Sequence, residues 1–224
     1  MSRLSDLRQR LVDGAAQLGL MLTAQQIDAL LAYMGLIGRW NQVYNLTAVR
    51  DPADMLTHHV LDSLAVVAPL RTRLAAIAYE MDGADLQFRL LDVGSGAGLP
   101  GIVIAICCPD IQVDCVDTVA KKAAFINQVA VSLKVPHLRG LHARVEKLGG
   151  LYDVVSSRAF ASLADFVSGS AQLLAGHGIW LAMKGKHPAD ELAVLPQDVK
   201  VFHVEQLAVP GLDAERCIVW MRKV

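Results

Sequence analysis

Leu90-Leu91-Asp92-Val93-Gly94-Ser95-Gly96-Ala97-Gly98-Leu99-Pro100-Gly101 joins a short apolar run, a carboxylate and a glycine-rich turn that opens into a second apolar run. The pattern predicts a strand, a tight turn and the first turn of a helix. Glycine is needed in such a turn where φ is positive, and where a ligand must approach the backbone N–H groups closely. The segment therefore predicts a loop that binds a nucleotide-like ligand.

Two cofactors fit the spacing of these glycines. Gly96, Gly98 and Gly101 satisfy the G-x-G-x-x-G pattern of a dinucleotide site. Gly94, Gly96 and Gly98 equally satisfy the G-x-G-x-G loop of methyltransferases that use S-adenosyl-L-methionine (AdoMet), with Asp92 two positions ahead. A carboxylate there suits the cationic methionine part of AdoMet better than an anionic pyrophosphate. The loop favours AdoMet, with a dinucleotide and a purely structural turn as alternatives.

The composition predicts a folded chain. Its 224 residues, 54% hydrophobic and 19% charged, are enough for a core of one domain with a small extension. We expect a helical extension over residues 1–80, packed on a cofactor-binding core over residues 81–224. The net charge of −1 gives no overall attraction to nucleic acid, so any RNA binding must use a local basic face.

No membrane or metal site is expected. The apolar run Leu99 to Cys108 is shorter than the roughly 18 residues of a membrane helix. Charged residues among the N-terminal leucines argue against a signal peptide or an anchor. The four cysteines form no C-x-x-C pair and have no closely spaced histidine, which is typical of reduced core thiols in a cytoplasmic protein.

The first part of the chain is predicted to be helical. Leucines recur at a helical period from Leu4 to Leu18, and a capping box of Thr23 and Gln26 opens a second helix. Asp51-Pro52 predicts the start of a third helix that continues toward Pro69. Between them, the segment Trp40–Arg50 fits neither period and is predicted to be a functional connector.

From Phe88 onward, strands and helices alternate, which predicts a parallel sheet covered on both faces. The last two strands are joined by a link too short for a crossover, so they must be antiparallel. This arrangement favours a Rossmann-like class I AdoMet-dependent methyltransferase, an α/β fold with a mostly parallel seven-stranded sheet that ends in an antiparallel hairpin. The expected strands are Leu90–Val93, Gln112–Val116, His137–His142, Tyr152–Ser157, Ile179–Met183, Val199–Leu207 and Arg216–Met221, and the expected core helices are Gly101–Cys108, Lys121–Leu133 and Leu163–Leu174.

Ligands of open α/β sheets bind beyond the carboxyl ends of the strands. Asp117, after the second strand, can accept hydrogen bonds from ribose hydroxyls, or it caps the following helix. Arg144-Val145-Glu146, after the third strand, can surround an adenine, or it is a solvated surface. Arg158, after the fourth strand, suits a base or a phosphate near the methyl group, with a surface salt bridge as the alternative.

Several further positive charges could contact RNA. Lys184 and Lys186 follow the fifth strand, and Arg50 lies in the connector near Asn45. A larger basic face could also include more distant residues, although the sequence does not show that they converge: Arg39, Arg71, Arg73, Lys121 and Lys122. The adjacent His58 and His59 would point about 100° apart on a helix, so both cannot face one ion.

Taken together, the motifs resemble the bacterial RsmG/GidB family, the small-subunit ribosomal RNA guanine-N7 methyltransferases. Ala97 departs from the family pattern, because many members have proline there. The glycine loop alone would indicate only the superfamily, whereas Asn-Leu-Thr-Ala, Gly-Leu-Pro-Gly and Ser-Arg-Ala-Phe are far more specific. The matching segments are Tyr44–Pro52, His59–Ser63, Asp92–Gly101, Arg144–Glu146, Ser157–Phe160 and Lys184-Gly185.

The resemblance implies that AdoMet is the cofactor and that the substrate is guanine 527, in the decoding region of 16S rRNA. The rRNA would be recognised in the 30S subunit or an assembly intermediate, without an obligate protein partner. The resemblance places Gly94, Leu99, Val145, Glu146 and Arg158 around AdoMet. To these we add the four residues that the loop and strand ends indicate: Asp92, Gly96, Gly98 and Asp117.

Guanine N7 has an in-plane lone pair, so its methylation requires alignment but no general base. We expect Arg158 to position the substrate and the methyl group, with Asn45 as a second catalytic candidate, and Arg50, Lys184 and Lys186 to bind RNA. Two other classes of function remain open at this point. One is a module that senses AdoMet or a nucleotide while bound to RNA, and the other is an oxidoreductase.

Overall fold

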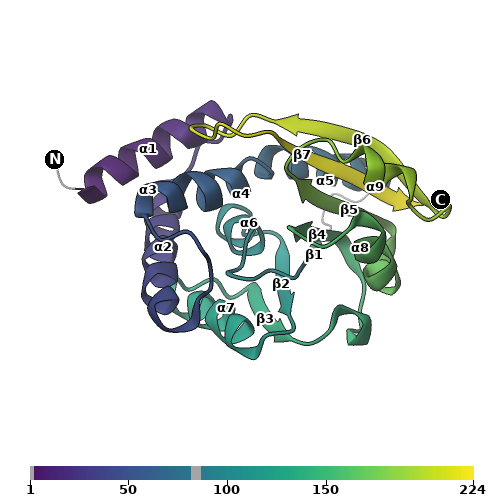
Figure 1. Cartoon of the computed structure of the whole chain (residues 1–224), viewed down its shortest axis with the longest axis horizontal. Helices are drawn as coiled ribbons and strands as arrows, with labels where there is room; N and C mark the ends of the chain where they lie inside the picture. The colour runs from purple at the N-terminus through teal and green to yellow at the C-terminus, as the bar shows by residue number, and fades with distance from the viewer. Residues whose placement is uncertain (1–2, 82–86) are drawn as a thin grey trace.

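A seven-stranded sheet forms the centre of the protein in the computed structural model, which describes residues 3–81 and 87–224 (Figure 1). The strands are β1 (Arg89–Val93), β2 (Gln112–Asp117), β3 (Leu138–His142), β4 (Tyr152–Arg158), β5 (Leu174–Lys184), β6 (Val199–Leu207) and β7 (Arg216–Lys223). Their order is β3-β2-β1-β4-β5-β7-β6. The first five run parallel, and β7 is antiparallel to both β5 and β6. The predicted sheet with its final hairpin is confirmed.

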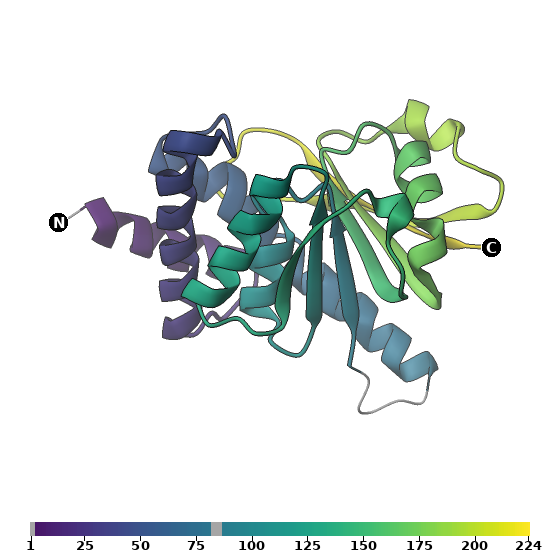
Figure 2. The same ribbon diagram turned by 90° about the horizontal axis from the view of Figure 1, so that it is seen from below.

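Helices cover both faces of this sheet. They are α1 (Arg3–Gln17), α2 (Ala24–Tyr44), α3 (Pro52–Met55), a π-helical segment (Leu56–Leu61), α4 (Asp62–Leu64), α5 (Val67–Glu80), α6 (Gly101–Cys107), α7 (Ala120–Ser132), α8 (Leu163–Ser170) and α9 (Ala189–Ala193). Short 3₁₀ turns span Val145–Lys147 and Ala171–Leu173. Figure 2 shows α6 and α7 on one side of the sheet, and α8 and α9 on the other.

The core consists of two buried clusters, one on each face. The first joins the N-terminal helices to the sheet and includes Leu30, Leu70 and Leu90. The second lies beneath α8 and includes Leu91 and Phe166. Because successive side chains of a strand point to opposite faces, Leu90 and Leu91 enter different clusters, which explains why apolar residues lie on both faces of β1. The division predicted at residue 81 stays a prediction, and residues 82–86 lie outside the described part of the chain.

The second helix is longer than its sequence pattern predicts. The capping box of Thr23 and Gln26 is present, but α2 continues to Tyr44, so the predicted connector beginning at Trp40 is wrong in its first half. Trp40 packs against Phe125 of α7, with ring centroids 5.3 Å apart, and this tertiary contact holds the extra turn. Asn45 ends the helix in the left-handed conformation, with φ of 48°.

The third predicted helix is divided. Asp51 caps α3 as expected, but a π-helical segment and α4 follow before α5 begins at Val67. Pro69, predicted as an end point, lies instead in the first turn of α5. Proline is tolerated there because the first N–H groups of a helix have no partner within the helix.

The fifth strand begins earlier than predicted. The helix expected over Leu163–Leu174 ends at Ser170, whose hydroxyl donates to the Phe166 carbonyl and accepts from the Trp180 indole. β5 then starts at Leu174, with an irregularity in its pairing to β4 that accommodates Gly176-His177-Gly178. A glycine pair flanking a histidine therefore marks a bulge here and not a loop.

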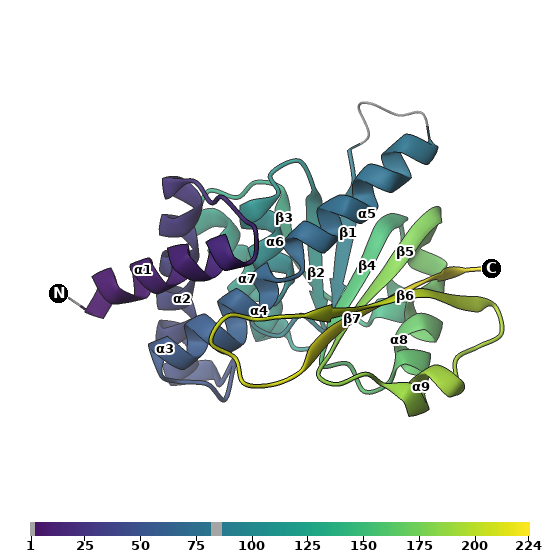
Figure 3. The same cartoon turned by 90° about the horizontal axis from the view of Figure 1, so that it is seen from above.

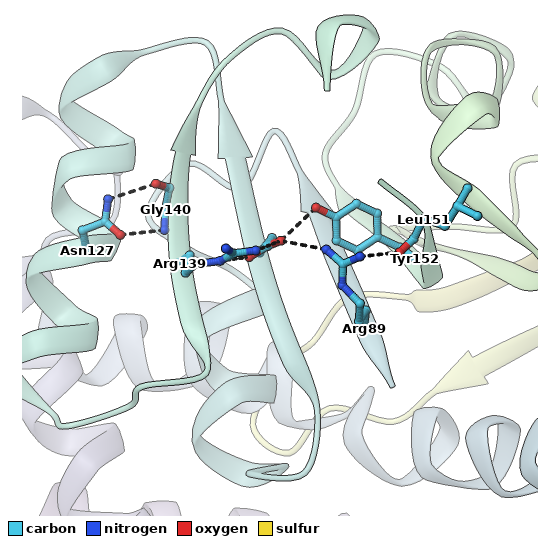
Figure 4. A network of polar contacts seen from close by, with 7 residues as sticks. Arg89, Asn127, Arg139, Gly140, Leu151 and Tyr152 are labelled. Carbon is cyan, nitrogen blue, oxygen red and sulfur yellow. Dashed lines mark hydrogen bonds and ion pairs between the residues drawn. The ribbon is translucent and has the colours of Figure 1, made fainter. Parts of the chain in front are cut away.

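A polar network ties the strands together on one face of the sheet (Figure 4). The buried Asp114 carboxylate accepts two hydrogen bonds of 2.8 Å from Arg139 and one of 2.8 Å from the Tyr152 hydroxyl. The amide of Asn127 donates to and accepts from the backbone of Gly140 on the edge strand β3. The contacts of Asp114 join β2, β3 and β4, and those of Asn127 separately join α7 to β3, so we assign both a structural role.

The four cysteines are free and buried, at positions 107, 108, 115 and 217. Within residues 3–81 and 87–224, no helix is long and apolar enough to cross a membrane. The same residues contain no group of three or more histidine, cysteine, aspartate or glutamate side chains that could hold a metal ion.

Replacing Gly101 with alanine is expected to destabilise the fold by about 2 kcal/mol, as overpacking of a core typically does. Gly101 begins α6 at its contact with β1 and β2, and a Cβ there would lie 2.4 Å from the Cys115 sulfur and 3.0 Å from Asp92 Cβ. Urea unfolding measures the loss. Gly96→Ala is the matched control, since its Cβ would meet no atom closer than 4.0 Å and its φ of 58° adds only about 1 kcal/mol of strain. Equal losses in both variants would contradict the steric explanation.

Candidate active site

The glycine loop adopts the tight turn that its sequence predicts. Gly94, Gly96 and Gly98 have φ angles of 66°, 58° and 88°, a region that side chains disfavour. The N–H groups of Gly94 and Ser95 both donate to the Val116 carbonyl at the end of β2. The loop is thereby fixed between β1, β2 and α6.

Asp92 supports this loop from below. Its side chain is fully buried, accepts a hydrogen bond of 3.1 Å from the Gly101 N–H, and accepts one of 2.9 Å from the Ser156 hydroxyl. Burial raises the pKa of Asp92 from 3.8 to about 7. It lines neither of the cavities described below. The structure therefore gives no support for direct contact between Asp92 and a cofactor; its carboxylate joins β1 and β4 to the first turn of α6.

A first cavity of about 460 Å³ opens beyond the carboxyl ends of β1, β2 and β3. Four residues predicted to bind the cofactor line it together: Gly94, Asp117, Val145 and Glu146. Apolar side chains, among them Phe160, form much of the remaining wall. A cavity with a glycine turn, a carboxylate and apolar walls has the chemistry that a nucleoside requires.

Asp117 both lines this cavity and braces its walls. One carboxylate oxygen accepts from the Gly96 N–H at 3.0 Å, and the other accepts from the Val119 N–H at 2.9 Å. Lys122 lies 3.5 Å from the same carboxylate. The residue preceding α7 is Val119, so Asp117 supports the turn before the helix but is not its N-cap. Each oxygen keeps a second lone pair that can accept a ribose hydroxyl.

A second cavity of about 440 Å³ adjoins the first. Gly94 lines both, so their occupants would meet at the glycine loop. Loop residues Gly96 and Leu99 contribute to the second cavity together with Arg158 and Lys184. The sequence did not single out five other lining residues as site residues: Leu46, Thr47, His59, Asp62 and Arg216.

A buried carboxylate holds two arginines at the second cavity. Asp62 is 2% exposed and pairs with Arg158 at 3.0 Å and with Arg216 at 2.8 Å. Arg158 also donates to the His58 carbonyl at 3.1 Å. The alternative of a salt bridge is therefore present for Arg158, but its carboxylate is buried and not on the surface. Two guanidinium groups on one carboxylate leave a net positive charge facing the cavity.

Arg216 reaches this position through the hairpin at the end of the chain. Figure 3 shows the link between β6 and β7 extending to the region of α3 and α4, and Gly211 in that link lies near Thr57 of the π-helical segment. The sequence signal was weak, because an arginine at the start of a final strand is unremarkable without this contact. Asp62 did carry a signal, because it lies in the segment His59–Ser63 that resembles the family motif.

His59 and Ser95 add buried polar groups beside the same cavity. His59 Nε2 lies 2.7 Å from the Thr47 hydroxyl, and burial lowers the pKa of His59 and favours the neutral imidazole. Three buried side-chain atoms of the described residues have no hydrogen-bond partner, namely His59 Nδ1, Ser63 Oγ and Ser95 Oγ, and His59 and Ser95 also line the second cavity.

Comparison with known proteins gives the family of the chain. Residues 26–219 match the family GidB, described as rRNA small subunit methyltransferase G. The chain belongs to the GidB family. Relatives named "Ribosomal RNA small subunit methyltransferase G" include one from Albidiferax ferrireducens, 64% identical over 97% of this chain and 98% of its own length. Another, from Leptothrix cholodnii, is 60% identical over 96% and 95%.

Solved structures share the fold at low identity. A SAM dependent methyltransferase from Aquifex aeolicus is 14% identical, with a TM-score of 0.54. The match covers 78% of this chain and 99% of that one. TrmN from Thermus thermophilus is 18% identical, with a TM-score of 0.51 over 72% of this chain and 49% of its own. The predicted Rossmann-like class I fold is confirmed, and membership of the GidB family together with this fold confirms AdoMet as the predicted cofactor.

Several predicted residues of this GidB protein lie outside both cavities or are paired with another side chain. Asn45 caps α2 and accepts a hydrogen bond of 3.4 Å from Arg50, which gives no support for a catalytic role of Asn45. Arg50 and Lys186 are exposed, as an RNA contact requires. Lys184 lines the second cavity but pairs with Glu191 at 2.8 Å.

Two arginines of the larger basic face also lie elsewhere. Arg71 pairs with Asp110, just before β2 and therefore at the opposite edge of the sheet. Arg73 stacks on Phe202 and Trp220 of the final hairpin. A single basic face that includes these two residues is wrong, and positive charge near the cavities comes from fewer side chains.

Proposed function

We propose that this protein transfers a methyl group from AdoMet to N7 of guanine 527 in 16S rRNA. One observation carries the proposal. A cavity suited to a nucleoside meets, at Gly94, a second cavity in which a buried carboxylate holds Arg158 and Arg216. Membership of the GidB family supports small-subunit rRNA as the substrate.

The residues of the first cavity fit AdoMet. A side chain at Gly94 would point toward Phe160, so the bare backbone leaves room for a ligand along the loop. Asp117 is placed to accept the ribose hydroxyls, and Val145 and Glu146 to contact the adenine. Leu99 and Gly96 would face the methionine part, where the two cavities meet. When bound, AdoMet supplies a methyl group on a cationic sulfonium.

The second cavity fits a guanine that needs positioning but no deprotonation. The N7 lone pair forms the new N–C bond as the S–C bond breaks, and positive charge moves to the purine. Arg158 and Arg216 offer donors suited to guanine O6 or a phosphate. Asp62 is already held by both arginines, which leaves it poorly suited to remove a proton. Alignment of the methyl group with N7 can supply several kcal/mol of the barrier reduction.

The proposed substrate also defines where the reaction takes place. We propose that the protein acts in the bacterial cytoplasm on the 30S subunit or an assembly intermediate, with Arg50, Lys184 and Lys186 as RNA contacts and without an obligate protein partner. No specific observation favours the oxidoreductase alternative or the AdoMet-sensing module.

Transfer of labelled methyl from AdoMet to 30S subunits, purified from cells that lack this gene, tests the proposal. We expect label in 16S rRNA and stabilisation of the protein against heat by AdoMet and S-adenosylhomocysteine but not by NAD. Stabilisation by NAD alone would indicate an oxidoreductase. Binding of AdoMet without transfer to any form of the rRNA would indicate a sensor.

Replacing Asp117 with alanine is expected to weaken AdoMet binding by about 1 to 3 kcal/mol, because hydrogen bonds to a carboxylate are of the stronger kind. Turnover at saturating AdoMet should fall less, since the ribose is remote from the transferred methyl. Calorimetric titration with AdoMet measures the affinity. Normal affinity in a folded Asp117→Ala protein would leave Asp117 only the bracing role that its bonds to Gly96 and Val119 show.

A further inference from the structure

An exposed aromatic side chain lies at the end of α2. Tyr44 is 39% exposed, and its ring packs against Trp40 at a centroid distance of 5.1 Å. Trp40 in turn contacts Phe125 of α7. Tyr44 is therefore held by the half-buried Trp40, which the buried Phe125 supports, while part of the Tyr44 surface stays open to solvent.

Positive charge borders this ring. The Lys121 ammonium lies 5.9 Å from the Tyr44 ring centroid, and Arg50 donates to the side chain of Asn45, the residue after Tyr44. In the part of the chain that the structure describes, neither Lys121 nor Arg50 forms an ion pair with a carboxylate. Val43 is 71% exposed beside them. The patch combines an aromatic face, an apolar side chain and two unpaired cations.

This patch borders both cavities. Figure 2 shows the end of α2 and the start of α7 at the edge of the sheet where the strands end. Val119, two residues before Lys121, lines the first cavity, and Leu46 and Thr47, two and three residues after Tyr44, line the second. Two residues of extended chain span at most about 7 Å, which is comparable to the spacing of neighbouring nucleotides.

We infer that Tyr44, with Lys121 and Arg50, forms a stacking platform for an unpaired RNA base that neighbours the nucleotide in the second cavity. Single-stranded RNA is commonly recognised through splayed bases that stack on aromatic side chains, while lysine and arginine hold the adjoining phosphates. A base on the ring and phosphates on the two cations would use all three side chains. The inference rests on the proposed function and deepens it, because it names how the RNA strand is held beside its target.

Substitution of Tyr44 tests the platform. Tyr44→Leu keeps apolar packing on Trp40 but removes the aromatic face. Tyr44→Phe keeps the aromatic face. We expect Tyr44→Leu to weaken binding to 30S subunits from cells lacking this gene by about tenfold, as loss of one base stack does. Tyr44→Phe should bind within about twofold of wild type, and AdoMet affinity should be unchanged in both. Lys121→Gln should lower the slope of log affinity against log salt by about 0.7.

Tyr79→Leu is the matched control, because Tyr79 is 88% exposed on α5, whose end lies at the opposite edge of the sheet (Figure 2). It should bind 30S subunits like wild type. Tyr44→Leu binding as tightly as wild type would overturn the inference, provided that the wild-type protein methylates 30S subunits. Absence of methylation by the wild type would instead overturn the proposed function.

Crosslinking separates RNA from a ribosomal protein as the occupant. With a photoreactive benzoylphenylalanine in place of Tyr44, irradiation of the 30S complex should label 16S rRNA within a few nucleotides of the methylated guanine. Label on a ribosomal protein, or no label in a complex that still binds and methylates, would overturn the inference.

Discussion

Replacing Arg158 with alanine is expected to lower kcat/KM for methyl transfer to 30S subunits by about 100-fold or more, the loss typical of a preorganised donor in an active site. Arg158 lies at the second cavity, is held by Asp62 at 3.0 Å and by the His58 carbonyl at 3.1 Å, and therefore keeps a fixed direction. Its removal loses both positive charge and alignment. Single-turnover methylation at saturating AdoMet measures the effect.

Two further measurements keep this prediction specific. Arg158→Lys preserves charge but not the planar fork, so it should recover only part of the activity. Removing Arg158 leaves the buried Asp62 with Arg216 as its single arginine partner. Urea unfolding therefore checks that the Arg158→Ala protein is still folded. A folded Arg158→Ala protein within threefold of wild-type kcat/KM would contradict the role assigned to Arg158.

The stability of the protein is expected to depend on the protonation of Asp92. Burial raises the pKa of this carboxyl from 3.8 to about 7, so the folded state binds a proton more tightly than the unfolded state. The stability contributed by that proton is present below about pH 4 and is lost as the pH rises to about 7. Three pKa units correspond to about 4 kcal/mol at most.

Asp92→Asn isolates this effect. An amide can accept from the Gly101 N–H and donate to the Ser156 hydroxyl, so the local geometry is kept without a titrating group. We expect the free energy of unfolding of the variant, relative to wild type, to increase between pH 4 and pH 7 and then stay level. Urea titrations across that range provide the measurement. A difference that does not change with pH would show that Asp92 titrates normally.

Local rules predicted the sheet and the nucleoside cavity because their signals are contiguous in the sequence. The glycine loop, the carboxylate of Asp117 and the pair Val145-Glu146 each follow a strand, and parallel strands bring their carboxyl ends to one edge. The final antiparallel pair followed from the length of one link. These features needed no knowledge of tertiary contacts.

The second cavity could not be predicted in the same way, because its walls come from distant segments. Arg216 from the last strand meets Arg158 on Asp62, a residue of the N-terminal helical part. The extra turn of α2 likewise depends on the contact between Trp40 and Phe125. For Asp92, the position in the motif suggested a contact with the ligand. Its side chain instead accepts hydrogen bonds from Gly101 and Ser156, which a sequence motif does not show.

Mapping the modified nucleotide tests the central claim most directly. Purified protein, AdoMet and 30S subunits from cells lacking this gene are incubated together, and the 16S rRNA is then cleaved chemically at N7-methylguanine and sequenced. We predict one new cleavage, at guanine 527, that is absent with the Arg158→Ala protein. A methyl group at another nucleotide, at another atom of guanine 527, or nowhere in the rRNA would contradict the account.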